Sequence, residues 1–544
     1  RAAIENFLME NPITLCPTRE SNPGPLDTHV RHILVPRDHE AVVVIDVYFS
    51  RKTNTSSRVD YNDGLDKTIV ESVMLDYPEG VKYEVHPETT DGETAVIKCS
   101  SLDGQMTTLK LQSLLPKTDD FEFVDFDPIN DKDTIKFYYK ESNEGKEIRH
   151  TLWVEYVNET DIMVPVRYEE QVYNEWLGYL NRHNIWDFFD FNTEFENDVF
   201  DVEQYECDEV ESIHSESVTK HLLFMDPDNN EHVDHVFNAF KTKYNSKYAD
   251  EREHAMRKSI FQQKLSLIKS TNRKNVGYKL AVNQFIDRTP EELKGYRGLK
   301  RRPEGRSGNI PFPYTEDHVK DLTPQLPKEY DLRMLGLVTW VKNQESCGSC
   351  WTFGTTAAVE GALARINGGK LITLANQALV DCAWPFGASG CKGGSDNAAY
   401  EWMMQYGLPT EEEYGLYVNE DGLCHIANMS VTYPILGYTD VTPYSIGALK
   451  VAIINHGPLS VSVHVTDAFS LYSGGIFYDI ECTPTDLNHE ITLVGYGEKD
   501  GETFWIVKNS WGPKWGIGGY MYISARDNNC GIATEPTYVT MKSV

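Results

Sequence analysis

The segment from Gln344 to Trp351, Gln-Glu-Ser-Cys-Gly-Ser-Cys-Trp, constrains this chain more than any other stretch. It places Cys350 where a Gly/Ser turn gives way to the Ala-rich run 352–366, which favours a helix. Unpaired backbone N–H groups and the positive end of a helix dipole both favour a thiolate over a thiol. A thiolate needs only a neighbouring imidazole as proton partner, and the Gln344 amide can point toward an oxyanion. The segment therefore predicts acyl transfer through a thioester.

Two segments further along the chain carry the partners that this chemistry requires. His489 lies in Leu-Asn-His-Glu-Ile-Thr-Leu-Val-Gly-Tyr-Gly, and Asn509 lies in Trp-Ile-Val-Lys-Asn-Ser-Trp-Gly. A Cys-Gly-Ser-Cys pair alone is also compatible with a redox or metal site. With both downstream motifs, the order and spacing resemble the papain and cathepsin family of cysteine proteases.

The resemblance implies a role for each of these residues. Cys350 would attack the scissile carbonyl, His489 would form an ion pair with it at rest, and Asn509 would orient the imidazole. The Gln344 side chain and the Cys350 backbone N–H would bind the oxyanion, and Trp511 would shield the His489–Asn509 bond from water. We expect neither a metal nor a cofactor.

The same resemblance predicts how a substrate is bound. Gly393 and Gly394 would pair with the peptide as an extra strand. The subsite for the residue second from the scissile bond would be lined by Ser395, Asp396, Ser462, Leu487 and Glu535. Asp396 and Glu535 stand where relatives that prefer Leu or Phe are apolar, so we expect Arg or Lys to be accepted beside hydrophobic residues. In the alternative, one acid points to solvent and the preference stays aliphatic.

Seven of the ten cysteines lie in the region of these motifs, and six remain once Cys350 is set aside. Their spacing alone permits fifteen connectivities. Each disulfide would contribute roughly 2–4 kcal/mol. The resemblance implies three pairs: Cys347–Cys391, Cys382–Cys424 and Cys482–Cys530. Three more cysteines, whose pairing the sequence does not predict, precede this region: Cys16, Cys99 and Cys207.

Two predicted helices precede the Cys350 region. Apolar residues at helical spacing predict the first: Val233, Phe237, Phe240 and Tyr244. The second would carry one stripe on a single face: Glu253, Arg257, Phe261, Ile268 and Asn272. Glu253 and Arg257 would form an i,i+4 ion pair. The stripe resembles the inhibitory pro-segment of cathepsin L-type proteases, except that Lys264 stands where that family usually has Asn.

The rest of this segment would cover the active site. Asn283-Gln-Phe285-Ile-Asp287 resembles the second motif of the family's pro-segment. The stretch 298–321 is rich in Pro, Gly and basic residues, and by resemblance it would cross the cleft in the direction opposite to substrate. Lys300-Arg301-Arg302 would be an exposed cleavage site, and the mature enzyme would begin near Leu326.

The first part of the chain predicts an antiparallel β-rich domain. Four segments are short, partly alternating, and rich in β-branched or aromatic residues: 41–49, 106–114, 134–139 and 151–156. The aromatic stretch Trp176–Phe191 would be a helix or an edge segment. The acidic stretch 194–216 would be a solvated linker. A β-rich domain ahead of such a zymogen resembles the arrangement in a group of invertebrate cathepsin-like proteinases.

The chain is long enough for two or three domains. We expect a β-rich domain with its acidic linker over 1–215, a helical inhibitory segment over 226–325, and a peptidase domain over 326–544. The fold class is α+β, and by resemblance the last domain is two-lobed and papain-like, with a helical lobe and a β-barrel-like lobe. No insertion resembles the occluding loop of exopeptidases, which favours an endopeptidase.

The net charge of −32 argues against nucleic acid or an anionic membrane as partner, and no apolar run is long enough to span a bilayer. The chain opens at Arg1 without a signal peptide, so we expect a processed product. The cysteines, with acceptor sequons at Asn54, Asn158 and Asn428, favour a secreted or lysosomal glycoprotein. The carboxylates begin to protonate near about pH 4–5, so acid is the expected trigger of activation.

The expected partners are protein and peptide substrates, together with the chain's own pro-segment as inhibitor. Two other functions remain open at this point. One is a transglutaminase-like acyl transferase, which also uses Cys and His, although Asn509 and the glycine pair disfavour it. The other is a binding or signalling protein that acts through the β-rich domain, whose ligand the sequence does not name.

Overall fold

The structure is a computed structural model of residues 1–544. It describes the following residues: 26–34, 43–52, 56–61, 66–71, 80–88, 96–103, 115, 120–129, 132–143, 146–157, 162–175, 179–192, 200–205, 207, 230–273, 276–302, 307–499 and 501–542. The chain divides into two compact units, Arg1–Lys274 and Asn275–Val544. No helix among these described stretches is long and apolar enough to cross a bilayer.

An eleven-stranded antiparallel sheet forms most of the first unit, in the order β6-β5-β4-β3-β2-β1-β11-β10-β9-β8-β7. Its strands are β1 (Leu26–Leu34), β2 (Val43–Lys52), β3 (Ser56–Tyr61), β4 (Asp66–Glu71), β5 (Val81–Glu88), β6 (Val96–Asp103), β7 (Glu122–Phe126), β8 (Thr134–Asn143), β9 (Lys146–Val157), β10 (Ile162–Asn174) and β11 (Tyr179–Asn192). This confirms the predicted antiparallel β-rich region. The predicted strand over 106–114 lies outside the described residues.

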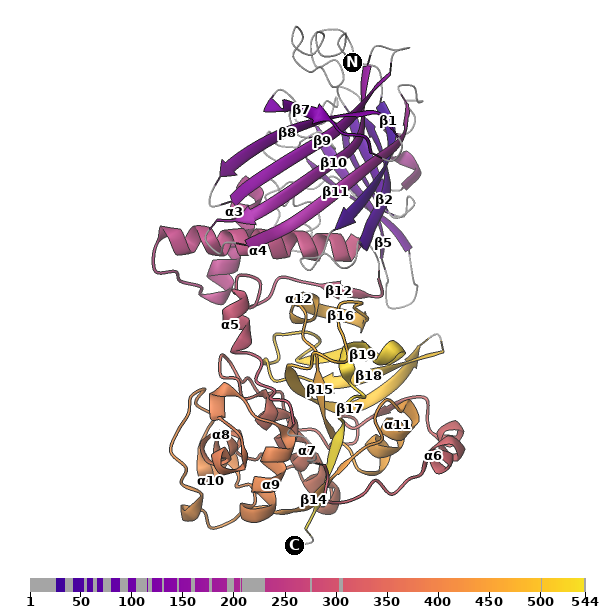
Figure 1. Ribbon diagram of the computed structural model, residues 1–544. Helices are drawn as coiled ribbons and strands as arrows, with labels where there is room; N and C mark the ends of the chain where they lie inside the picture. Colours follow the sequence, from indigo (N-terminus) through magenta and orange to yellow (C-terminus); the bar gives the residue numbers. More distant parts are fainter. Residues whose placement is uncertain are drawn as a thin grey trace. The chain divides into compact units, whose positions relative to one another are not determined.

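One face of this sheet carries an apolar core. Phe137 lies opposite Leu152, and Ile135 lies opposite Val154, across the β8–β9 ladder. All four side chains are buried, and Val59 of the distant strand β3 belongs to the same cluster. The sheet is therefore strongly curved, as Figure 1 shows in indigo to magenta. Large apolar residues on alternate positions produce such a one-sided core.

Two predictions for the first unit are corrected. Residues 179–191 of the aromatic stretch are neither a helix nor an edge, because they belong to β11, which lies between β1 and β10. Part of the expected solvated linker is packed: Phe200 is buried and Cys207 forms a disulfide with Cys99. Composition marks 194–216 as solvated, but one aromatic side chain and one covalent bond outweigh its charge locally.

The two predicted helices at the end of this unit are present as α3 (Asn230–Tyr244) and α4 (Glu251–Arg273). The rings of Phe237 and Phe261 pack with their centroids 5.1 Å apart. Glu253 and Arg257 form the predicted ion pair at 3.0 Å. The helical spacing of the apolar residues therefore produced the expected helical pair.

The second unit combines helices with a nine-stranded sheet in the order β12-β16-β19-β18-β17-β15-β20-β14, with β13 paired to β17. The strands are β12 (Tyr278–Leu280), β13 (Tyr330–Asp331), β14 (Ile435–Asp440), β15 (Leu459–Val463), β16 (Tyr472–Phe477), β17 (His489–Lys499), β18 (Glu502–Lys508), β19 (Tyr520–Ser524) and β20 (Thr537–Met541). The helices are α5 (Pro290–Lys294), α6 (Glu316–Leu322), α7 (Cys350–Ile366), α8 (Asn376–Cys382), α9 (Asp396–Tyr406), α10 (Glu411–Tyr414), α11 (Ile446–Asn455) and α12 (Asp467–Ser470).

Helix α7 is the centre of this unit. Fifteen of its residues are buried, which explains a sequence rich in Ala and Thr on every side. One side of α7 contacts β15, β17 and β20, and the other contacts α8 and α9. Figure 1 shows the orange helices on one side of α7 and the yellow sheet on the other. This arrangement places Cys350, at the start of α7, where the helical and sheet halves meet.

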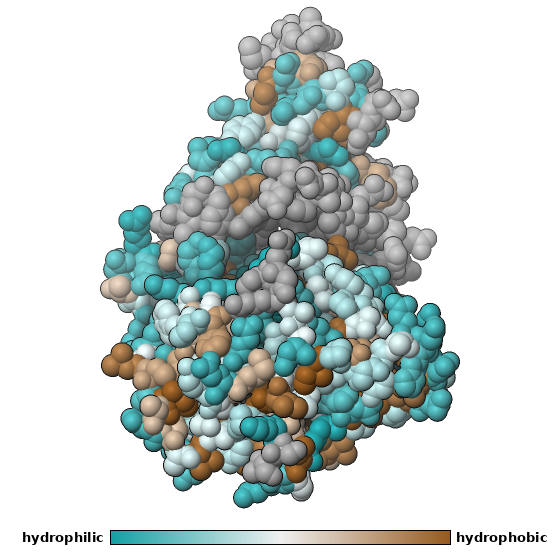
Figure 2. All heavy atoms as spheres, turned by 60° about the horizontal axis from the view of Figure 1, so that its bottom comes forward, coloured by the Kyte–Doolittle hydropathy of each residue, from teal (hydrophilic) through white to brown (hydrophobic). Residues whose placement is uncertain are grey.

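The surface of this unit mixes apolar and polar residues. Figure 2 shows hydrophobic patches interspersed with hydrophilic ones on the face that it presents. Trp340 is 60% exposed and is one of several large apolar side chains on the surface. Scattered exposed apolar side chains are common on proteins, so they assign no partner to this face.

Candidate active site

His489 and Asn509 form a directional pair. His489 opens β17, and Asn509 directly follows β18, which pairs with β17 through Thr492 and Lys508. The ladder brings the His489 Nε2 atom to 2.9 Å from the Asn509 Oδ1 atom. The Trp511 ring stacks on the imidazole at 4.8 Å, and all three side chains are buried. The Asn509 carbonyl thus orients the ring, and the indole separates this bond from solvent.

The thiol of Cys350 lies at the first position of α7, with Ser349 before it as the N-cap residue. It is fully buried, and among the described cysteines it alone is outside a disulfide. The second imidazole nitrogen, Nδ1 of His489, has no hydrogen-bond partner among the described residues. Nδ1 therefore remains available to exchange a proton with a thiol.

Burial disfavours the charged form of both groups in this form of the chain. Burial, followed by the charge of Glu490, raises the pKa of the Cys350 thiol to about 12. Burial lowers the pKa of His489 to about 4, despite its bond to Asn509. Burial in the covered chain therefore opposes the ion pair expected at rest, and that ion pair stays a prediction for the activated enzyme. The expectation rested on the helix terminus, and loss of water outweighs that effect here.

The backbone of the inhibitory segment is what covers the thiol. Gly298 lies close to Gly348, two residues before the nucleophile. A Cβ atom added to Gly298 would stand 1.8 Å from the Gly348 carbonyl oxygen. Leu299 forms a parallel bridge with Gly394. Two hydrogen bonds hold it, from Gly394 N to Gly298 O at 2.9 Å and from Lys300 N to Gly394 O at 2.7 Å. The segment thus uses the edge that the resemblance assigns to substrate.

One of the two donors expected at the oxyanion site, the Gln344 side chain, also binds the inhibitory segment. Gln344 Nε2 and Trp511 Nε1 each donate to the carbonyl oxygen of Tyr296, both at 3.3 Å. The Ser510 hydroxyl donates to Gln344 Oε1 at 2.6 Å and so fixes which end of the amide faces the groove. A carbonyl of the chain's own backbone therefore binds where the resemblance places a developing oxyanion.

The second pro-segment motif anchors this cover. Asn283 Nδ2 donates to the Ser470 carbonyl at 2.8 Å, and its Oδ1 atom accepts from Phe285 N at 3.0 Å. The Phe285 ring lies 4.9 Å from the Trp511 ring and 4.9 Å from the Tyr296 ring. The aromatic contacts connect the motif to the indole that covers His489.

Further along, Arg302 is held in a carboxylate cage, which we define as Asp396, Asp440 and Glu535. Arg302 Nε donates to Asp396 Oδ1 at 2.9 Å, and Nη1 donates to Asp440 Oδ1 at 2.9 Å. A carboxylate oxygen of Glu535 lies 3.9 Å from Nε, and its backbone carbonyl accepts from Nη2 at 3.2 Å. Burial opposes the charge of Arg302, but the carboxylates raise its pKa overall.

This arrangement corrects one prediction and extends another. The Arg302 side chain is only 12% exposed, so the basic triplet does not present it as an open cleavage site. Asp396 and Glu535 do face one cationic side chain together, as expected of a basic subsite. Asp440, at the end of β14, was missed because no motif surrounds it.

The other predicted subsite residues lie on three different elements or loops. Ser395 is buried at the N-cap of α9, directly before Asp396. Ser462 lies opposite Glu490 in the β15–β17 ladder. Leu487 lies beside Gly531, where an added Cβ atom would stand 2.4 Å from its Cδ2 atom. Glu490 was missed although it directly follows His489 in the sequence.

Four disulfides connect described cysteines. Three are the pairs that the family resemblance implies: Cys347–Cys391, Cys382–Cys424 and Cys482–Cys530. The fourth, Cys99–Cys207, was left open by the sequence. Cys16 lies outside the described residues. Within the described stretches, no cluster of His, Cys, Asp and Glu has the arrangement of a metal site.

Comparison with known proteins agrees with this geometry. Residues 326–540 match the family described as papain family cysteine protease, and residues 237–293 match the cathepsin propeptide inhibitor domain. Pro-cathepsin H of Medicago truncatula is 40% identical over 306 residues, which are 56% of this chain and 85% of that protein. Digestive cysteine proteinase 2 of Homarus americanus is 39% identical over 309 residues, 55% of this chain and 92% of that protein.

Among solved structures, digestive procathepsin L2 proteinase from the larval midgut of Tenebrio molitor is similar, with a TM-score of 0.52 and 35% identity. The match covers 57% of this chain and 99% of that one. These matches support the protease and not the transglutaminase-like alternative. A nucleophile at the start of α7, an imidazole held by an amide, and a covering inhibitory segment all agree with them: the chain belongs to the papain family of cysteine proteases.

Proposed function

We propose that this chain is the zymogen of an endopeptidase in which Cys350 is the nucleophile, His489 its proton partner and Asn509 the residue that orients the imidazole. The inhibitory segment would span 226–325 and the peptidase 326–544. The observation that carries the proposal is the His489–Asn509 bond of 2.9 Å, together with an Nδ1 atom on the same ring that has no hydrogen-bond partner in the described part of the chain.

The reaction begins when the cover leaves and water returns to the groove. Charge then costs less, and a proton moves from the Cys350 sulfur to His489 Nδ1. The thiolate attacks the scissile carbonyl carbon, and the carbonyl oxygen becomes an oxyanion bound by Gln344 Nε2 and the Cys350 backbone N–H. The imidazolium gives its proton to the leaving amine, and a thioester forms. Water, activated by the neutral imidazole, then hydrolyses the thioester.

Inhibition follows from the same contacts. Tyr296 O occupies the Gln344 donor, and Gly298 excludes water and substrate from the sulfur. Leu299 bridges Gly394 in the parallel sense, so the segment runs opposite to the direction that the resemblance assigns to substrate. Reversed polarity explains how a peptide can fill the groove without presenting a bond in the correct orientation.

For substrate preference, we propose that the carboxylate cage accepts Arg or Lys as the residue second from the scissile bond. The seat of Arg302 supports this, because the chain's own guanidinium already has partners on Asp396, Asp440 and Glu535. A substrate arginine would replace Arg302 after activation. Hydrophobic residues at that position would leave the three carboxylates without a cation, which costs binding energy.

We further propose a secreted or lysosomal route. Asn428 is exposed, as glycosylation requires, whereas Asn54 and Asn158 lie outside the described residues. The processed enzyme would begin near Leu326, whose neighbour Pro327 accepts a hydrogen bond from the Tyr496 hydroxyl at 2.8 Å.

The test of the catalytic assignment is acidification of the purified full chain, followed by labelling with a thiol-directed epoxide. We expect a fragment beginning near Leu326 to take up label and hydrolyse peptides. Cys350→Ala should abolish both, and Asn509→Ala should lower kcat. Equal activity in Cys350→Ala would contradict the assignment.

The specificity test uses paired peptides that differ only in Arg or Leu at the second position. Wild type should prefer Arg, and Glu535→Ala should lose that preference through KM. A preference for Leu in both wild type and Glu535→Ala would contradict the proposal of a basic subsite. It would leave the catalytic assignment intact.

A further inference from the structure

The Glu490 side chain is buried against the first turns of α7, the helix that begins with the reactive Cys350. Glu490 follows His489 in β17, so its side chain points to the opposite face of the strand from the imidazole. It enters the space beside Gly354, which lies one helical turn beyond Cys350 in α7. A Cβ atom on Gly354 would stand 3.0 Å from the Glu490 Cγ atom. A glycine at that position therefore makes room for the acid.

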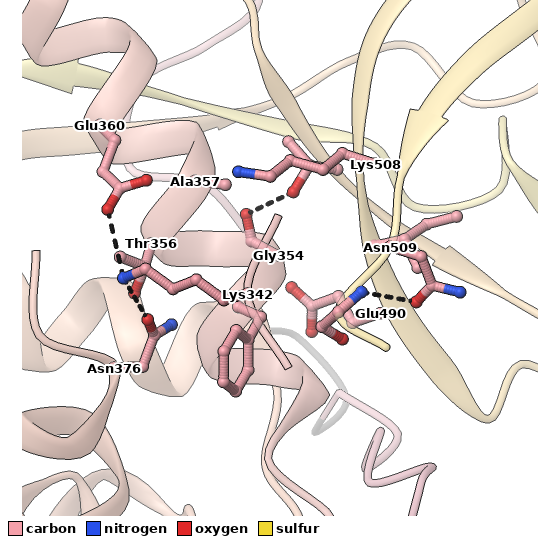
Figure 3. Close-up of a pocket in the computed structure, with 13 residues that line it drawn as sticks. Lys342, Gly354, Thr356, Ala357, Glu360, Asn376, Glu490, Lys508 and Asn509 are labelled. Atoms are coloured by element: carbon pink, nitrogen blue, oxygen red, sulfur yellow. Dashed lines mark hydrogen bonds and ion pairs between the residues drawn. The ribbon is translucent and has the colours of Figure 1, made fainter. Parts of the chain in front are cut away.

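This carboxyl group is only half satisfied. The Ser460 hydroxyl donates to Glu490 Oε1, but Oε2 has no hydrogen-bond partner among the described residues, and no ion pair reaches it there. Figure 3 shows Glu490 pointing into a buried cavity that Lys508 also lines. An ionised carboxylate in such a place is costly, whereas a protonated carboxyl is not.

The charged and titratable groups that face Glu490 come from several elements. From α9 and the chain before β20, two acids oppose its ionisation, and Arg302 of the inhibitory segment favours it. Arg302 leaves when the cover leaves, so the activated enzyme has one cation fewer near Glu490. The titratable and charged groups around it, together with those that line the cavity, are Cys350, Asp396, Tyr400, Glu535, Arg302, Lys342, Glu360 and Lys508.

We propose that Glu490 is a positioning residue that limits the reactivity of Cys350 at alkaline pH. The proposal rests on the catalytic role of Cys350. While Glu490 holds its proton, the thiolate forms next to a neutral group. Once Glu490 loses that proton, its charge repels the thiolate, and the proton on His489 returns to the Cys350 sulfur.

Burial and the neighbouring Asp396 raise the pKa of Glu490, and an ionised Glu490 raises the pKa of Cys350. The imidazolium would be attracted by the same charge. The two side chains leave β17 on opposite faces, however, whereas the sulfur lies on the α7 surface that Glu490 packs against. Repulsion of the thiolate therefore exceeds attraction of the imidazolium.

The test measures alkylation of Cys350 by neutral iodoacetamide across about pH 5–9 in the full chain after acid activation. Glu490→Gln keeps an oxygen for the Ser460 hydroxyl but has no charge. At the alkaline end we expect its rate to exceed that of wild type by about threefold or more, with similar rates at the acidic end. Glu360→Gln, in the same cavity but about three turns along α7, is the matched control and should follow wild type.

A second variant tests the same idea without removing the acid. Ser460→Ala deletes the hydrogen bond that favours ionisation of Glu490. The alkaline part of its profile of alkylation rate against pH, which we call the alkaline limb, should therefore also shift to higher pH. An alkaline limb that is unchanged or shifted downward in Glu490→Gln would overturn the proposal. Absence of labelling in wild type itself would instead point to failure of the catalytic assignment.

Discussion

The inhibitory segment holds the groove in two different ways. Over Cys350 it uses main chain alone: the Tyr296 carbonyl, the Gly298 backbone and the Leu299–Gly394 bridge. At the carboxylate cage it uses one side chain, Arg302, against three acids. The first contact depends on space and the second on charge. Changes of size should therefore break one contact, and changes of pH or charge the other.

The largest effect is expected from Gly298→Val, which tests the contact that depends on space. Its side chain cannot fit 1.8 Å from the Gly348 carbonyl oxygen, so the main-chain cover should lift. Overpacking typically costs 1–3 kcal/mol, so we expect about tenfold or more faster labelling of Cys350 in the unprocessed chain at neutral pH. Gly474→Val is the control, because nothing lies within 4 Å of its Cβ position. Equal labelling of both variants would contradict the spatial account.

Arg302→Met tests the contact that depends on charge. Removing one partner of a buried ion pair costs roughly 3–5 kcal/mol, so the variant should activate at higher pH than wild type. The measurement is the pH at which the full chain is converted to the mature fragment, followed on a gel across a series of pH values. Arg301→Met, an exposed neighbour, should activate like wild type. Identical pH dependence in Arg302→Met and wild type would show that the cage does not hold the segment.

The pH dependence of stability measures how fully the main-chain cover excludes water. The pKa of His489 is lowered from 6.5 to about 4. Between these two pH values, His489 binds a proton in the unfolded chain but not in the covered chain. Stability from this group is therefore complete above about pH 6.5 and is lost as pH falls toward about 4, by roughly 3 kcal/mol. Urea unfolding of Cys350→Ala at several pH values measures it. Cys350→Ala/His489→Gln should lack that loss.

The smallest effect on stability is expected at the Glu253–Arg257 ion pair, which is distant in sequence from both contacts. The bonds of Glu253 to Ala249 N and Arg257 lower its pKa. Its contribution is therefore present above about pH 4.5 and is lost as pH falls further. Glu253→Gln should lower the stability of α4 by only about 0.5 kcal/mol, as i,i+4 pairs usually do, in hydrogen exchange of that helix. A much larger loss would give this pair a role comparable to the cage.

Sequence reasoning succeeded where local patterns decide the structure. The spacing of Phe237 and Phe240 predicted α3, and the motifs around Cys350, His489 and Asn509 predicted the family. The three disulfides that the family implies also occur in the structure. Each of these depends on residues near one another in sequence or on a motif shared with relatives.

It was less informative where distant residues meet. β11 is central because β1 pairs with its other edge, about 150 residues away in the chain. Asp440 and Glu490 lie at the site because of the register of their strands in the sheet, and no sequence motif predicts that register. Burial raises the pKa of the Cys350 thiol, and a helix-terminus argument on Cys350 alone does not include that burial.

The Cys99–Cys207 bond has a consequence for how the first unit responds to proteolysis. It closes a loop between two cysteines that are 108 positions apart in sequence, and the loop contains β7 to β11. A single cut anywhere within that loop would leave both fragments covalently attached, and the chain would run as one species until a reductant is added. Any peptide released from this unit during maturation must therefore arise outside the loop, or from two cuts within it.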